Sequence, residues 1–107
     1  MVKLESYELG EFYIQKIEHS PSCPIMQVSG YIGTLSDGTK IGFHFSKDNS
    51  LCIATDIESG CAICKYPTPE ECLEWISDNY ARIEDRKLTF DYDYRLNRFK
   101  MLCKELL

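Results

Sequence analysis

The sequence predicts an α+β fold, in which an antiparallel meander sheet of about five strands is covered on one face by two C-terminal helices. Two observations predict it. Residues 9–66 hold short runs of alternating apolar and polar side chains separated by turn residues, whereas residues 68–107 repeat apolar side chains at helical spacing. Short connections favour antiparallel pairing of successive strands, and amphipathic helices are the natural cover for a sheet. A chain of 107 residues fits a single domain, 1–107.

The first half predicts strands at residues 9–17, 25–35, 40–46, 51–55 and 61–66. The strongest local signal is Asp37-Gly38 between two alternating runs, which is typical of a tight hairpin. Along the third strand the odd-numbered side chains are apolar, so we expect His44 to lie with Ser46 on the polar face. The opposite face is expected to bury Phe43, Phe45 and Val28.

The second half predicts two helices. The first begins at Thr68-Pro69-Glu70-Glu71, where an N-cap Thr, a Pro at the first helical position and a Glu three residues after the cap form a capping box. Its core-facing stripe is expected to contain Cys72, Ile76, Asn79, Tyr80 and Ile83. The second helix is expected over residues 90–106, with a short strand at 86–92 as the alternative. Its seam is expected to contain Tyr92, Leu96, Phe99, Cys103 and Leu106.

Negative charge is concentrated on the first helix. The chain has 17 acidic and 12 basic residues, a net charge of -5, and residues 68–85 hold six acidic residues and one basic residue. A helical wheel places four carboxylates on one arc opposite the core stripe, with Trp75 at its border. The four are Glu70, Glu71, Glu74 and Asp78. They span a rise of about 12 Å, in which one strand of duplex DNA, at about 3.4 Å per phosphate, presents three or four charges.

This acidic face predicts a non-enzymatic domain that binds a basic surface of another protein, with carboxylates in place of phosphates. Proteins that handle nucleic acids are the natural targets, and phage inhibitors of restriction or CRISPR systems are one kind of protein built in this way. We expect partner binding through Glu70, Glu71, Glu74, Trp75 and Asp78, and a monomer or homodimer that contacts neither nucleic acid nor membrane. An ordinary solvated face is the alternative interpretation, since Glu70 and Glu71 also suit the positive end of the helix dipole.

Six cysteines include one close pair, Cys61 and Cys64. A structural zinc site needs four ligands, commonly two close pairs, and here the remaining ligands would have to be single residues such as Cys23, His19 or His44. We therefore expect reduced thiols in a cytoplasmic protein without metal or cofactor. A metal-binding or thiol-redox domain that uses Cys61 and Cys64 is the alternative function.

Other functional classes find no support in the sequence. The glycines do not form a phosphate-binding loop before a helix, and no apolar run reaches the roughly 18 residues of a membrane span. Cys and His residues are too scattered to define a nucleophilic site, so no catalytic residue is predicted. The last predicted helix carries four cations, which we expect to pair with the acidic helix. They are Arg95, Arg98, Lys100 and Lys104.

Overall fold

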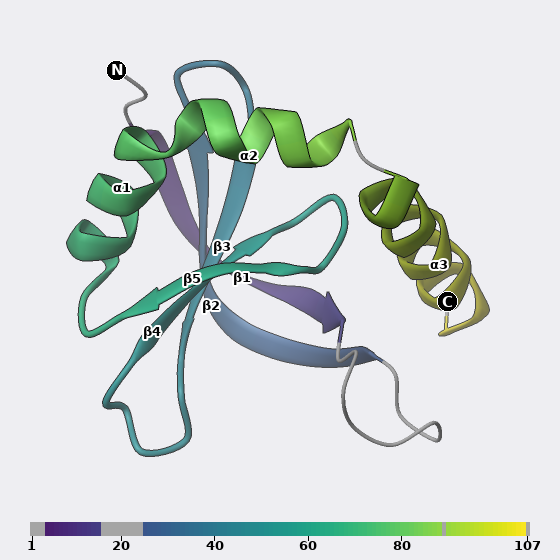
Figure 1. The fold of residues 1–107 in the computed structure, drawn as a ribbon. Coiled ribbons are helices and arrows are strands. Elements are labelled where there is room, and N and C mark those ends of the chain that lie inside the picture. The colour runs from purple at the N-terminus through teal and green to yellow at the C-terminus, as the bar shows by residue number, and fades with distance from the viewer. Residues whose placement is uncertain (1–3, 16–24, 89, 107) are drawn as a thin grey trace.

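The computed structural model describes residues 4–15, 25–88 and 90–106, which form one five-stranded antiparallel sheet and three helices. The strands are paired in chain order from β1 to β5, so the predicted α+β meander is confirmed (Figure 1). The strands are β1 Leu4–Gln15, β2 Ile25–Leu35, β3 Lys40–Phe45, β4 Cys52–Asp56 and β5 Ala62–Tyr66. The helices are α1 Pro69–Asp78, α2 Tyr80–Lys87 and α3 Phe90–Leu106. His19 and Cys23 lie outside the described residues.

The β2–β3 hairpin forms at the predicted Asp37-Gly38 turn. Gly38 has φ +90°, a left-handed conformation that glycine adopts without strain, and its N–H donates to the carbonyl oxygen of Leu35 at 2.9 Å. The backbone N–H of Thr39 donates to Asp37 Oδ1 at 2.9 Å. Side-chain and backbone hydrogen bonds therefore specify the turn together.

Strand β1 begins earlier than the sequence predicts. It starts at Leu4 instead of residue 9, and it pairs with β2 along its whole length, from Leu4 opposite Leu35 to Gln15 opposite Ile25. It forms one edge of the sheet. The expected continuation to residue 17 falls outside the described residues.

The main core lies between the sheet and α1. In the sheet register Phe43 pairs with both Tyr31 and Ala54, so these side chains share one face, and α1 packs on that face against β4 and β5. Cys72 and Ile76 point from α1 into the core, as the helical stripe predicted. The buried cluster contains Leu35, Ile41, Phe43, Cys52, Ala54, Cys72 and Ile76.

Part of the opposite face of the sheet is buried as well, which corrects the expectation that His44 lies on a polar face. Only 7% of His44 is exposed, and its ring lies edge-on to Phe12 with centroids 5.8 Å apart. Phe12 reaches β3 because Gly42 has no side chain: a Cβ there would lie 2.6 Å from two Phe12 ring carbons. Val28, opposite Phe12 in the register, belongs to this second face and not to the face of Phe43.

The first predicted helix is divided in two at Asn79. Its start is as predicted, since the N–H of Glu71 donates to Thr68 Oγ1 at 3.2 Å. At Asn79 the backbone leaves helical geometry (φ -115°, ψ 19°), and its Nδ2 donates to the Trp75 carbonyl oxygen at 2.9 Å. Three helices therefore follow the sheet instead of two, and α2 carries Tyr80 and Ile83 at half-buried positions.

Helix α3 occupies the predicted range, and the alternative strand at residues 86–92 is wrong because α2 continues to Lys87 and α3 begins at Phe90. Instead of covering the sheet face beside α1, α3 lies beyond α2 (Figure 1). Its buried Phe99 packs over Gly60 in the β4–β5 turn. Tyr92, Leu96 and Cys103 of the predicted seam are half-buried, and the side chain of Leu106 lies outside what the structure describes.

Candidate functional site

The acidic face of α1 is exposed. Its four carboxylate residues are all accessible to solvent, while Cys72 and Ile76 on the other side of the helix are buried. Thr68 caps the helix and Pro69 starts it, so the helix is well defined from its first turn and helical geometry sets the spacing of the carboxylates. The structure thus brings together Glu70, Glu71, Glu74 and Asp78.

Trp75 takes a different position from the four carboxylates. Its ring is half-buried, packs against the core cluster and lines a cavity of about 260 Å³ between the helices and the sheet. Trp75 therefore helps to anchor α1 on the core. The acidic face that a partner would meet consists mainly of carboxylates.

The α3 cations do not pair with α1 as the sequence suggested. Helix α1 packs on β4, β5 and α2, whereas α3 packs on α2 and β2, so α2 separates the two helices. Arg98 Nη1 donates to Gln15 Oε1 of β1 at 3.3 Å. An ion pair within α2 joins Lys87 Nζ and Glu84 Oε1 at 3.4 Å.

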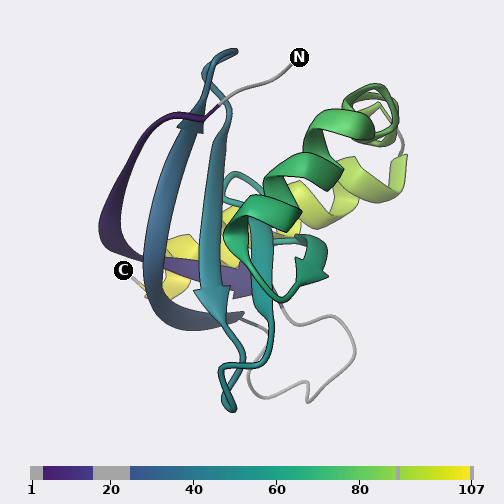
Figure 2. The same cartoon turned by 90° about the vertical axis from the view of Figure 1, so that its left-hand side faces the viewer.

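An exposed apolar strip lies on the same sheet face as α1. In the register Leu9 pairs with Tyr31, which in turn pairs with Phe43 of the core, so all three share that face. Leu9 is 76% and Tyr7 64% exposed, and Tyr7 meets Tyr31 edge-on with ring centroids 5.6 Å apart. Figure 2 shows β1 and β2 (purple and blue) to one side of α1, with no helix in front of them.

The sequence analysis did not identify the exposed side chains of Tyr7 and Leu9 as an apolar surface. The signal for them was the continued alternation of Tyr7 and Leu9 with Glu8 and Gly10, which extends β1 toward the N-terminus. Exposed aromatic and large aliphatic side chains are typical of protein interfaces.

Four of the described cysteines lie in two environments. Cys64 lies with Cys52 and Cys72 under α1, where the Cys72 thiol donates to the Cys52 carbonyl oxygen at 3.4 Å and the Cys64 thiol to the Cys72 carbonyl oxygen at 3.8 Å. Cys61 is buried at the start of β5, beside Ser59. Within the described ranges, no three His, Cys, Asp or Glu side chains converge in a way that could hold a metal ion.

Burial disfavours thiolate formation in the cluster under α1. Loss of water around the sulfur, and then the neighbouring Cys72, raise the pKa of Cys52 and the pKa of Cys64 to about 12. Thiolates are the nucleophiles and metal ligands of cysteine chemistry. The environment of Cys64 is therefore that of a structural thiol.

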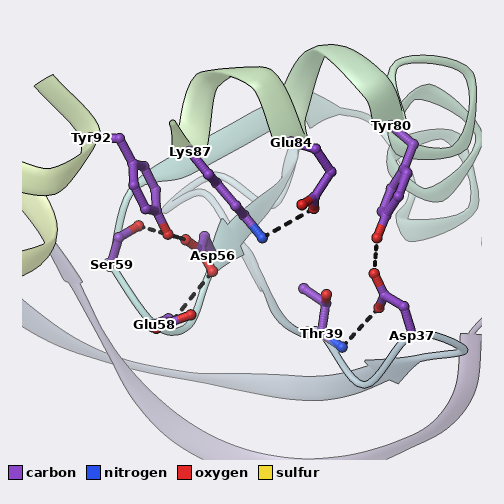
Figure 3. A network of polar contacts seen from close by, with 9 residues as sticks. All are labelled: Asp37, Thr39, Asp56, Glu58, Ser59, Tyr80, Glu84, Lys87 and Tyr92. Carbon is purple, nitrogen blue, oxygen red and sulfur yellow. Dashed lines mark hydrogen bonds and ion pairs between the residues drawn. The ribbon is translucent and has the colours of Figure 1, made fainter. Parts of the chain in front are cut away.

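A polar network attaches α3 to the β4–β5 turn. Buried Asp56 accepts hydrogen bonds at Oδ2 from the Tyr92 hydroxyl at 2.6 Å and from Ser59 Oγ at 2.8 Å (Figure 3). Burial, and then the hydrogen bond to Asp56, raise the pKa of Tyr92, so its hydroxyl stays protonated as the donor. The network provides a structural link between a helix and the sheet.

A second contact attaches α2 to the hairpin. Tyr80 at the start of α2 donates from its hydroxyl to Asp37 Oδ2 in the β2–β3 turn, the same carboxylate whose other oxygen receives the Thr39 N–H (Figure 3). Together with the contact of Tyr92, it attaches the helical layer to two neighbouring turns at one end of the sheet. These contacts hold α2 and α3 against the sheet, and α1 leads directly into α2.

Comparison of the chain with known protein families, with curated proteins and with solved structures finds no match. Its function must therefore be inferred from the residues of this chain. None of the helices in the described ranges is both long and apolar enough to cross a membrane.

Proposed function

We propose that this chain is a non-enzymatic protein-binding module whose acidic α1 face docks on a basic surface of another protein. The observation that carries it is the exposure of Glu70, Glu71, Glu74 and Asp78 on one face of a capped helix. Charges with this arrangement attract a cationic surface at long range and orient it during encounter.

The partner's chemistry follows from the spacing of the charges. Four carboxylates within a rise of about 12 Å match the linear charge density of a nucleic-acid strand. A groove of Lys and Arg side chains that accepts phosphates would therefore accept α1. Proteins that handle nucleic acids present such grooves, and phage inhibitors of restriction or CRISPR nucleases exemplify the proposed class.

The exposed strip of Tyr7, Leu9 and Tyr31 supplies the apolar part of the interface. Charged groups at the rim of an interface mainly control the association rate, whereas apolar side chains that become buried contribute most of the affinity. Both features occur on the face of the sheet that carries α1. A partner that covers α1 and extends over β2 would bury them together.

The experiment compares capture of partners by wild-type protein and by Glu74→Lys/Asp78→Lys from the same extract, at 50 mM and 500 mM salt. We expect specific partners to be retained by wild type at low salt and lost from the double variant. Both positions are exposed, so the substitutions leave the core unchanged.

The matched control is Glu8→Lys/Asp85→Lys, which changes the net charge equally at exposed positions outside α1. It should retain the partners that the α1 variant loses. Equal capture by all three proteins, loss from both variants alike, or capture of nothing specific by wild type would each contradict the proposal.

A further inference from the structure

The second face of the sheet forms a cavity that the acidic helix does not contribute to. It has a volume of about 670 Å³ and lies over the strands on the side of Val28 and His44, with α3 at one end. Known small-molecule sites have volumes of about 300 to 1,000 Å³. Its apolar wall is made by side chains from three strands, Ile14, Met26, Val28 and Ile53.

The charge of this cavity is opposite to that of the chain. Its basic side chains are Lys47 after β3, Lys65 on β5 and Arg95 on α3, and no Asp or Glu is among the described residues that line it. The whole chain carries 17 acidic residues and a net charge of -5. In a chain with a net negative charge, a cavity with three basic side chains and no carboxylate in its described lining favours an anionic occupant.

Two buried polar atoms within the wall have no hydrogen-bond partner among the described residues. They are Nδ1 of His44, which is 7% exposed, and Oγ1 of Thr55, which is 1% exposed. Leaving such an atom unpaired costs folding free energy, and most buried polar groups are therefore paired with protein or ordered water. Both side chains line the cavity, so a ligand or an ordered water molecule in it can supply their hydrogen bonds.

The polar atoms and the nearest cation form one group. In the sheet register His44 lies opposite Ile53, and Ile53 opposite Lys65, so the imidazole and the ammonium stand in one row on the same face. Thr55 lies two residues along β4 from Ile53, diagonal to His44. His44, Thr55 and Lys65 therefore lie on one face of the sheet and all line the cavity, next to its apolar wall.

We propose that this cavity binds a small amphipathic anion, an apolar body with one carboxylate or phosphate head, whose head group contacts His44, Thr55 and Lys65. The site is independent of the acidic α1 face, since no residue of α1 lines it. An anionic oxygen accepts from the Thr55 hydroxyl and from the ammonium of Lys65, and the imidazole supplies a further donor.

The test uses three anionic probes, octanoate, 1-naphthoate and phenyl phosphate, each with its neutral counterpart, octanol, 1-naphthamide and phenol. Titrations are followed by methyl and amide NMR signals and by calorimetry. We expect at least one anion to give saturable shifts at Val28, Ile53 and His44 and to bind at least tenfold more tightly than its neutral counterpart. The carboxylate and phosphate arms identify the preferred head group.

Two variants separate binding from folding. Thr55→Val keeps the side-chain shape and removes the hydroxyl, so affinity should fall roughly tenfold while the melting temperature of the ligand-free protein stays equal or rises. Lys65→Met should weaken the anion at least threefold and remove most of the salt dependence of binding. Lys40→Met, an exposed lysine on β3 outside the cavity, should leave binding unchanged.

Three results would overturn the proposal. They are the absence of saturable shifts with all three anions, equal affinity for anion and neutral counterpart, or shifts confined to Tyr7 and Leu9 on the other face. If Thr55→Val fails to fold, Lys65→Met with its Lys40→Met control still decides the role of the cation. Binding unaffected by Lys65→Met would contradict the assigned head-group site.

Discussion

Gly60 in the β4–β5 turn is expected to be indispensable for the attachment of α3. It has φ +71°, and a Cβ at this position would lie 2.6 Å from Cδ1 and 2.8 Å from Cζ of Phe99. Gly60→Ala therefore combines backbone strain with a clash against a buried ring. Gly38 separates the two effects, because it has φ +90° but a Cβ there would meet no atom within 4 Å, which makes Gly38→Ala the matched control.

The expected losses in the free energy of unfolding follow from these two effects, the backbone strain and the clash. An alanine in a left-handed conformation costs about 1 to 2 kcal/mol, which both substitutions share. Forcing extra volume against a well-filled site costs about 1 to 3 kcal/mol more, and only Gly60→Ala has this cost. We expect a loss in the free energy of unfolding of about 1 to 2 kcal/mol for Gly38→Ala and about 2 to 5 kcal/mol for Gly60→Ala.

Urea denaturation followed by circular dichroism measures both losses. Phe99→Leu removes Cε1 and Cζ of the ring, so in that background the cost of Gly60→Ala should approach the cost of Gly38→Ala. Equal losses for the two glycine variants in the wild-type background would refute the contact of Phe99 with Gly60. A cost that stays the same in Phe99→Leu would refute the clash as its cause.

Three further predictions concern the same framework. Tyr92→Phe removes a hydrogen bond to buried Asp56, and the free energy of unfolding should fall by about 1 to 3 kcal/mol in urea denaturation; an unchanged midpoint would contradict the network. Burial raises the pKa of Cys52 and the pKa of Cys64 from 9.0 to about 12, so the thiols of the unfolded state lose their protons first as the pH rises. The stability of the fold should therefore be fully present below pH 9 and decline between pH 9 and 12. A wild-type melting temperature that stays constant over this window would disprove it. A chain ending at Arg98 loses the second half of α3 with the buried Phe99, and burial of a side chain of this size contributes about 1.5 to 3 kcal/mol, so the melting temperature should fall; a cooperative melt near the wild-type temperature would show that this half of α3 is dispensable.

Features set by neighbouring residues were predictable from the sequence. The Asp37-Gly38 turn and the Thr68 cap each depend on hydrogen bonds within two or three residues, and both form as expected. The exposure of the α1 carboxylates was predictable for a related reason, because helical geometry alone places them opposite Cys72 and Ile76.

Features set by residues far apart in the chain were not predictable in this way. Alternation along β3 assigned His44 to the polar face of the sheet, but Phe12 from β1 covers it by crossing over Gly42, so His44 is buried. The cavity was missed for the same reason, since its wall comes from several strands. The break at Asn79 was missed because the apolar seam continues through it, although its side chain and its backbone N–H both donate to the Trp75 carbonyl oxygen.

The most direct test of the proposed function is the association rate of a purified partner with this chain, measured by stopped-flow fluorescence over a range of salt concentrations. If the α1 carboxylates steer the encounter, Glu74→Lys/Asp78→Lys should lower the association rate at least tenfold at 50 mM salt, and the difference from wild type should shrink as salt increases. Glu8→Lys/Asp85→Lys should keep a rate close to that of wild type. Equal rates and equal salt dependence for wild type and the α1 variant would contradict the assignment of the acidic face as the binding surface.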